Sequence, residues 1–133
     1  MKKQKKHILS EKSVQKYMRD WLYKNGWDRK FLSADLREQG VDIEVQNSKR
    51  HFFLIECKGS GHYENDFINS LGQICTRMKR IPKGVNYGIA LPSEGAKKAV
   101  KRIPKRFAIN NRLNVFSVSD TGKVKRYKPS DMR

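Results

Sequence analysis

The sequence predicts a single α/β domain in which helices pack on a central mixed sheet. Residues 41–46 alternate apolar and polar side chains, and residues 51–58 contain an apolar run that ends in charged residues. The two segments are typical of strands joined as a hairpin by the turn at 47–50. The apolar run at 85–91 is typical of a buried strand that a crossover connection joins to the hairpin. Amphipathic helical patterns precede the hairpin and separate it from this run. Together these elements indicate the α/β class.

The first helix is expected to begin after Ser10, which suits an N-cap, and to end at residues 25–26, an Asn-Gly pair. Leu9 and Val14 have the spacing of a hydrophobic staple. The apolar residues of the inward helix face are Val14, Met18, Trp21 and Leu22. Beyond the helix, residues 27–34 are expected to form a strand, and residues 35–40 a polar loop that is a candidate substrate contact.

The hairpin is expected to direct acidic side chains from both strands toward one side. In its first strand, one face carries Val41, Ile43 and Val45, and the opposite face carries Asp42 and Glu44. In its second strand, one face carries Phe53, Ile55 and Cys57, and the other carries Phe52, Leu54, Glu56 and Lys58. Segment 52–55 is apolar enough for a central strand, so ionisable groups at its carboxyl end point to a functional site.

After the hairpin, apolar residues between Glu64 and Arg80 recur at helical intervals and predict an amphipathic helix that covers the sheet. The strand at 85–91 follows Gly84. A further helix is expected from Ser93 to about Ile103, where Pro104 stops it. Two edge strands are expected to complete the chain, at 113–118 and 123–127, around a turn at 120–122.

Composition limits the class of partner. The chain of 133 residues has 30 Lys and Arg against 13 Asp and Glu, a formal net charge of +17 and a pI near 10.1. A field of this sign attracts polyanions, and nucleic acid is the commonest polyanion that such a protein binds. Residues 1–8 are expected to be a basic flexible tail and residues 9–133 a single folded domain, because the length leaves no room for a second core.

No apolar run approaches the roughly 18 residues of a membrane span, and the lysine-rich start is not followed by a signal-peptide core. A soluble, cytoplasmic protein without a membrane partner is therefore expected. Cys57 and Cys75 lie in apolar segments without metal-binding spacing, which predicts reduced thiols in the core and no disulfide.

Asp42, Glu56 and Lys58 are the residues whose pattern carries chemistry. Glu56 and Lys58 are two positions apart on one strand and emerge on the same face, while Asp42 comes from the neighbouring strand. Carboxylate oxygens without histidine or thiolate suit Mg²⁺ or Mn²⁺ rather than zinc. A bound divalent ion polarises a phosphodiester, and a lysine beside it can neutralise transition-state charge. The pattern therefore indicates metal-dependent phosphodiester hydrolysis.

The run Gly40, Val41, Asp42, then thirteen residues, then Glu56, Cys57, Lys58 and Gly59 resembles the active-site signature of the PD-(D/E)xK nuclease superfamily. The resemblance covers roughly residues 9–92. It implies a restriction endonuclease-like core of helix, three strands, helix and strand around a central mixed sheet, here with an extra C-terminal helix and strands. In size and charge the chain is similar to small Holliday junction resolvase-like members. Val41 replaces the usual proline before the aspartate.

The resemblance also implies roles for individual residues. Asp42 and Glu56 are implied as metal ligands, with the Cys57 main-chain carbonyl as a further ligand and Lys58 serving the nucleophilic water. Glu11 lies where members carry another acid on the first helix, and its face is shared with Val14, so it is expected to point inward. Gln73 is similar to a glutamine on the helix after the ExK strand, although Arg77 stands where an aromatic residue is usual.

Other polar residues have weaker patterns. Glu38 is an alternative to Glu11 as the third acid, and Glu44 is expected to be an exposed carboxylate at the rim. His51 and His62 lack ligand spacing and are expected at the surface or in turns. Ser33 and Ser60 are candidate phosphate contacts. The candidate nucleic-acid contacts are Lys79, Arg80, Lys97, Lys98, Lys101, Arg102, Lys105 and Arg106.

The sequence therefore predicts a Mg²⁺-dependent endonuclease, with Mn²⁺ able to substitute, that hydrolyses DNA by recognising shape rather than a long sequence. Paired cuts need paired active sites, which favours a homodimer, although the sequence pattern does not identify a dimer surface. Two alternatives stay open: a basic nucleic-acid-binding protein without catalysis, and a member of the same superfamily that acts on RNA.

Overall fold

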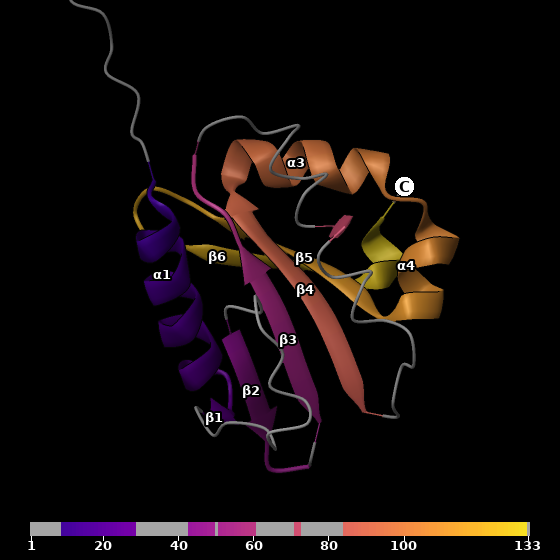
Figure 1. Ribbon diagram of the computed structural model, residues 1–133, viewed down its shortest axis with the longest axis horizontal. Coiled ribbons are helices and arrows are strands. Elements are labelled where there is room, and N and C mark those ends of the chain that lie inside the picture. Colours follow the sequence, from indigo (N-terminus) through magenta and orange to yellow (C-terminus); the bar gives the residue numbers. More distant parts are fainter. Residues whose placement is uncertain (1–8, 29–42, 50, 61–70, 73–83, 133) are drawn as a thin grey trace, which may run out of the picture.

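The computed structural model describes residues 9–28, 43–49, 51–60, 71–72 and 84–132 (Figure 1). Its helices are α1 (Glu11–Lys24), α3 (Ser93–Arg102), α4 (Lys105–Asn111) and the 3-10 turn η1 (Pro129–Asp131). Its strands are β1 (Trp27–Asp28), β2 (Ile43–Asn47), β3 (Phe52–Cys57), β4 (Val85–Pro92), β5 (Leu113–Val118) and β6 (Val124–Tyr127).

The first helix has the predicted ends. The Ser10 side chain accepts a hydrogen bond of 3.1 Å from the Ser13 amide, which satisfies one of the free donors at the start of α1. Asn25 closes the other end, and Gly26 follows with a φ of +88°, a conformation that glycine adopts without strain. Leu9 and Val14 are both buried in one apolar cluster, as expected of a staple.

The described strands form one mixed sheet of six strands in the order β1-β2-β3-β4-β5-β6. The hairpin β2-β3 is antiparallel with Ile43 opposite Ile55, as the alternation predicted. Strands β3, β4 and β5 are parallel to one another, and β6 returns antiparallel to β5. The predicted α/β class and the mixed sheet are therefore confirmed.

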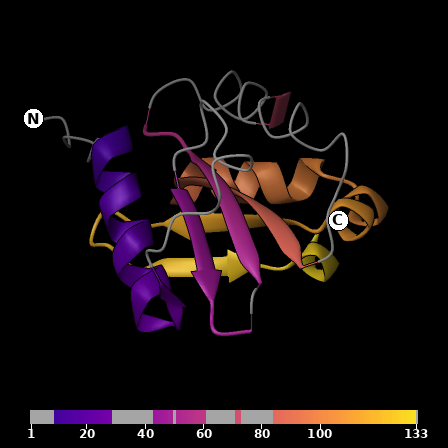
Figure 2. The same ribbon diagram turned by 60° about the horizontal axis from the view of Figure 1, so that its bottom comes forward.

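The two faces of the sheet carry separate apolar cores. On one face, α1 covers Phe53, Ile55 and Cys57 of β3 together with residues of β2 and β5. On the other, α3 and α4 cover Leu54 and residues of β4 and β5. Figures 1 and 2 show α1 on one side of the sheet and α3 and α4 on the other. Face assignments along β3 are thus as predicted.

The prediction that β5 is an edge strand is wrong. It lies between β4 and β6, and all of its residues are buried. Its polar Asn114 tolerates burial because the side-chain amide donates to the carbonyls of Tyr87 and Arg112 and accepts from Arg126 Nε at 3.0 Å. Tyr87 and Arg126 come from other strands, so the sequence of β5 alone does not reveal that Asn114 is buried.

Helix α4 was not predicted as an element separate from α3. It begins after Pro104 and ends at Arg112, whose φ of +50° is left-handed. Its sequence offers little apolar periodicity, with Ala108 its one buried residue, and the helix packs on η1 and β5. Tertiary contacts rather than local pattern therefore stabilise it.

Several predicted segments lie outside the described residues: the tail 1–8, most of the strand 27–34, the loop 35–40 and most of the helix 64–80, of which Leu71 and Gly72 are helical. Of the helices that the structure describes, none combines the length and apolar character that crossing a lipid bilayer requires.

Candidate active site

Glu56 and Lys58 lie at the carboxyl end of β3, a strand with neighbours on both sides. Glu56 Oε2 is 3.8 Å from Lys58 Nζ, and the side chains are 4% and 22% exposed. The Lys58 amide donates to the carbonyl of Ala90, so pairing with β4 continues one residue beyond β3. The sequence prediction that both side chains share a face is confirmed by this contact.

Glu56 is buried, with 3% of its surface exposed. It is opposite Ile89 of β4, and Leu54 precedes it on the same face in the apolar core under α3. Its Oε1 atom has no solvent-accessible surface. Taking a carboxylate out of water is costly unless other groups compensate its charge. A carboxylate in this position is a strong candidate for a functional group.

Glu44 is a second buried carboxylate on this face, and the prediction of an exposed rim residue is wrong. It is 9% exposed, and its Oε1 atom is inaccessible to solvent. In the β2-β3 register Glu44 is opposite Leu54, which makes it the diagonal neighbour of Glu56. Side chains of this length reach each other across such a diagonal. Alternation gives the face of a residue but not the segments that cover it, so sequence alone did not reveal the burial.

The start of α1 is fastened to the residues that follow Lys58. The Ser60 amide donates to the Leu9 carbonyl at 2.7 Å, and Ser60 Oγ accepts from the Leu9 amide at 2.9 Å. A Cβ added to Gly59 would lie only 2.5 Å from the Glu11 nitrogen. Ser60 remains a predicted phosphate contact, and in the structure its hydroxyl oxygen joins the start of α1 to the segment after Lys58. The sequence feature that could have indicated this contact is the pair Gly59 and Ser60, directly after Glu56, Cys57 and Lys58.

The prediction that the Glu11 side chain points inward is wrong. Glu11 is exposed, and its Oε2 accepts a hydrogen bond of 3.4 Å from Gln15 Nε2. It occupies the first turn of α1, and the buried residues of the helix begin at Val14. Its backbone still lies against Gly59, so the carboxylate reaches solvent beside the end of β3.

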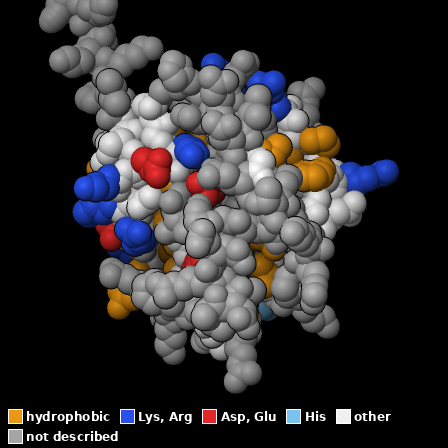
Figure 3. All heavy atoms as spheres, viewed as in Figure 1, with side chains coloured by type: hydrophobic (Ala, Val, Ile, Leu, Met, Phe, Trp, Pro, Cys, Tyr) orange, Lys and Arg blue, Asp and Glu red, His pale blue; other side chains and the backbone are white. Residues whose placement is uncertain are grey.

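Two helix N-termini meet this edge of the sheet. The carboxyl ends of the parallel strands β3, β4 and β5 share one edge, α3 starts directly after Pro92 of β4, and α1 starts against Gly59. Helix N-termini carry partial positive charge and favour anions. Figure 3 shows acidic and basic side chains close together near the start of α1. Open α/β sheets commonly bind ligands outside these strand ends.

The remaining predicted residues fall into three groups. Those outside the described residues are Asp42, Gln73, Lys79, Arg80, Glu38, Ser33, His62 and Cys75. Cys57 is a buried cysteine, as predicted. His51 is exposed beside the β2-β3 turn, also as predicted. Exposed basic residues on α3 and α4 are Lys97, Lys98, Lys101, Arg102, Lys105 and Arg106.

Within the ranges that the structure describes, no three potential metal-binding side chains come together. Asp42 immediately precedes Ile43, and Ile43 pairs with Ile55, the residue before Glu56. The described part of the site is therefore the Glu56–Lys58 pair with Glu44 on the same face, and the start of α1 beside it.

Comparison of the chain with protein-family models, with curated proteins and with solved structures finds no match.

Proposed function

We propose that the chain is a divalent-metal-dependent endonuclease that hydrolyses phosphodiester bonds of DNA. The observation that carries this proposal is the buried Glu56 carboxylate, 3.8 Å from the ammonium of Lys58, at the carboxyl end of a central strand. A chain of net charge +17 brings phosphate groups to such a site. An acid and a lysine held together in that field suit reaction at a phosphodiester.

The donor set fits a hard divalent cation. Glu56 contributes carboxylate oxygens from within the apolar core, and Glu44 lies diagonally beside it. Mg²⁺ prefers such oxygens, and Mn²⁺ accepts the same ligands. We propose Glu56, Asp42 and the Cys57 carbonyl as ligands. When bound, the ion polarises the phosphodiester and lowers the pKa of a water molecule.

Lys58 supplies a positive side-chain charge in addition to that of the cation. Its ammonium, held beside Glu56, orients the attacking water and offsets the negative charge that develops on the phosphoryl oxygens. The water oxygen bonds to phosphorus while the bond from phosphorus to one sugar oxygen breaks, which leaves a phosphate monoester and a hydroxyl. The Glu56 side chain is 4% exposed, so solvent screens its charge less than it would at the surface.

The order of α1, the β2-β3 hairpin and a parallel β4 agrees with a restriction endonuclease-like core, which supports the proposal. The resemblance of this small, basic chain to Holliday junction resolvase-like nucleases favours a DNA substrate that is branched or otherwise distorted. It also favours a homodimer that makes paired cuts. DNA is the preferred partner, and RNA is the alternative within the same chemistry.

The second candidate function is nucleic-acid binding without catalysis. The exposed basic residues of α3 and α4 favour it, because phosphate contacts alone give affinity without any reaction. In that case Glu56 and Lys58 form a structural ion pair.

The test is to incubate supercoiled plasmid, a four-way DNA junction and single-stranded RNA with wild type, Lys58→Ala and Lys49→Ala, in Mg²⁺ or in chelator. Lys49 is exposed in the turn at the opposite end of β3, so Lys49→Ala removes one positive charge, as Lys58→Ala does, but far from the site. Lys58→Ala is expected to cut about 10²–10³-fold more slowly, with Lys49→Ala unchanged. Binding without a Mg²⁺-dependent product on any substrate would favour the second candidate.

A further inference from the structure

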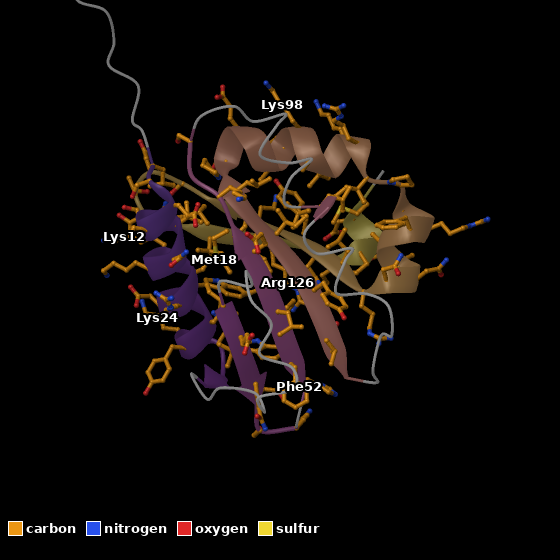
Figure 4. All side chains as sticks on the ribbon, viewed as in Figure 1. Lys12, Met18, Lys24, Phe52, Lys98 and Arg126 are labelled. Carbon is orange, nitrogen blue, oxygen red and sulfur yellow. The ribbon has the colours of Figure 1, made fainter. Side chains whose placement is uncertain are left out.

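Arg126 of β6 lies on the sheet face that α1 covers, opposite to the face of the candidate active site. It pairs with Phe116 of β5, which belongs to the apolar cluster under α1. Its guanidinium carbon is 5.1 Å from the centroid of the Phe53 ring, in the same cluster. Figure 4 shows Arg126 near the middle of the molecule, whereas the labelled lysines lie toward its margin. The Arg126 side chain therefore extends across the sheet face rather than away from it.

Two contacts hold the guanidinium group in place. Arg126 Nε donates to Asn114 Oδ1 at 3.0 Å. Asn114 is fully buried, and its amide nitrogen donates to the carbonyls of Tyr87 and Arg112, so its oxygen is the atom that faces Arg126. The fully buried ring of Phe53 provides an aromatic surface for the cation. The orientation of the guanidinium group is therefore set by the fold itself.

Most of the hydrogen-bonding capacity of Arg126 remains available. A guanidinium group has five N–H donors, and the one on Nε is bonded to Asn114. Within the described ranges, the two Nη atoms donate to no acceptor and no carboxylate forms an ion pair with Arg126. Burial lowers the pKa of Arg126, and no carboxylate of these ranges raises it. A charge that is partly removed from water without an opposite charge is costly, so these groups are suited to an anion that binds from outside.

The chemistry around Arg126 favours phosphate as that anion. The two Nη groups form a fork that matches two oxygens of one phosphate or carboxylate group. Residues 121–130 include Lys123, Lys125 and Lys128 and contain no acid, and the whole chain has a net charge of +17. A phosphate monoester carries a charge of about −1.5 to −2 at pH 7, more than the single charge of a carboxylate, and a polyphosphate chain carries many. A positive field therefore favours phosphate over carboxylate.

We propose that Arg126 is the centre of a phosphate-binding site on the α1 face of the sheet, separate from the candidate active site. Its two Nη groups bind two phosphate oxygens, while Asn114 and Phe53 hold the guanidinium group. Part of the Arg126 side chain is exposed, so an anion can reach it. The phosphate belongs either to a nucleic-acid strand or to a small ligand such as a nucleotide. The inference does not depend on cleavage, because no step of the proposed reaction uses this face.

Trp27 provides a reporter for this site. Its ring centroid is 4.8 Å from that of Phe53, and the Arg126 guanidinium carbon is 5.1 Å from the same centroid, so the two groups lie within about 10 Å of each other. The chain has two tryptophans, and Trp21→Phe leaves Trp27 as the single one. The fluorescence of Trp27 in this variant should therefore change when an anion binds at Arg126.

Titration with inorganic phosphate, in chelator and against chloride at equal ionic strength, tests the site. Saturable change of Trp27 fluorescence in Trp21→Phe, and a rise of Tm in wild type, are expected with phosphate but not with chloride. Arg126→Gln should bind phosphate at least about tenfold more weakly, because the charged hydrogen bonds are lost. Arg19→Gln is the control, since it removes an exposed arginine of α1. Arg126→Lys keeps the charge without the fork, should also bind more weakly, and replaces Arg126→Gln if glutamine prevents folding.

The absence of saturable phosphate binding by wild type, or equal affinities in Arg126→Gln and Arg19→Gln, would overturn the proposal. A merely structural Arg126 would give this second result, with a lower Tm in Arg126→Gln at every phosphate concentration. Failure of the proposed nuclease activity would leave these measurements unaffected, because they are made without metal and without cleavage.

Two further ligands identify the source of the phosphate. If it belongs to nucleic acid, a DNA oligonucleotide without terminal phosphates should bind Arg126→Gln about tenfold more weakly than Arg19→Gln, and inorganic phosphate should compete with it. If it belongs to a small ligand, a nucleoside monophosphate should raise the Tm of Arg19→Gln but not of Arg126→Gln, with equal DNA affinities in the two variants. Either result supports a phosphate site at Arg126, and equal behaviour of the two variants toward both ligands would contradict it.

Discussion

Tyr87 and Glu56 lie on the same sheet face and respond differently to burial. Tyr87 is 1% exposed and faces Leu54 across the β3-β4 pairing. Burial raises the pKa of the Tyr87 phenol above its ordinary value of 10.0, and the charge of Arg112 partly opposes this. The neutral phenol of Tyr87 therefore needs no charged partner in the core. The carboxylate of Glu56 is different, because the Lys58 ammonium lies 3.8 Å away and compensates its charge.

The raised pKa of Tyr87 predicts a loss of stability in alkali. Below the pKa of the unfolded chain the phenol is protonated in both states. As pH rises above about 10, the unfolded chain releases this proton first, so the free energy of unfolding falls until pH passes the folded pKa. Tyr87→Phe should therefore show a shallower fall than wild type in urea unfolding between pH 8 and 10.5. The exposed Tyr23→Phe serves as control, and parallel profiles for Tyr87→Phe and wild type would contradict the interpretation.

Sequence patterns predicted which residues share a face better than they predicted which residues are covered. The faces of Glu44, Glu56 and Lys58 follow from strict alternation along a strand. The exposure of Glu44 and Glu11 was predicted wrongly, because it depends on segments packed from elsewhere in the chain. Asp42, on which the signature also depends, stays a prediction, since it lies outside the described residues.

At the scale of elements, the contact between α1 and the end of β3 couples a helix to the candidate site. Gly59 has the start of α1 against its backbone, and Ser60 bonds to Leu9 in both directions. The atoms that a Cβ at Gly59 would meet belong to the backbone of residues 9–11, which cannot rotate away as a side chain can. Any added side chain must therefore displace α1 or the segment after Lys58.

Gly59→Ala is expected to destabilise the fold by about 1–3 kcal/mol and to slow cleavage, because overpacking shifts the residues next to Lys58. Gly72→Ala is the matched control. Gly72 is helical and an added Cβ there would meet nothing within 4 Å, so alanine should keep stability or add up to about 1 kcal/mol. Thermal unfolding compares the two variants. Wild-type stability and rate in Gly59→Ala would show that this contact is unimportant.

The elements that sequence predicted are those with local signals. Ser10 and 25–26 cap α1, alternation marks β2, an apolar run marks β3, and Pro104 ends α3. The interior position of β5 and the separate helix α4 were missed, because parallel pairing with β4 and packing on η1 join segments distant in sequence. Non-local contacts of this kind leave little trace in a short window of residues.

At the scale of the whole molecule, one sheet separates two cores and gives each face its own task. The face that α1 covers is an apolar cluster, and the N-terminal end of α1 is held beside the carboxyl ends of the parallel strands. The opposite face carries Glu44, Glu56 and Lys58 and is covered by α3 and α4. A net charge of +17 opposes compaction through self-repulsion, and a bound polyanion relieves this repulsion. The molecule therefore carries its candidate acids on the sheet face that α3 and α4 cover.

The Mg²⁺ dependence of single-turnover DNA cleavage by wild type and Glu56→Gln tests the central proposal most directly. Glutamine keeps the size of the side chain and removes the charge that a cation needs. Wild type should cut with a rate that saturates with Mg²⁺ and vanishes in chelator, and Glu56→Gln should be slower by at least about 10²-fold at saturating DNA while still binding it. Cleavage that persists in chelator, or equal rates in the two proteins, would contradict a metal-dependent nuclease centred on Glu56.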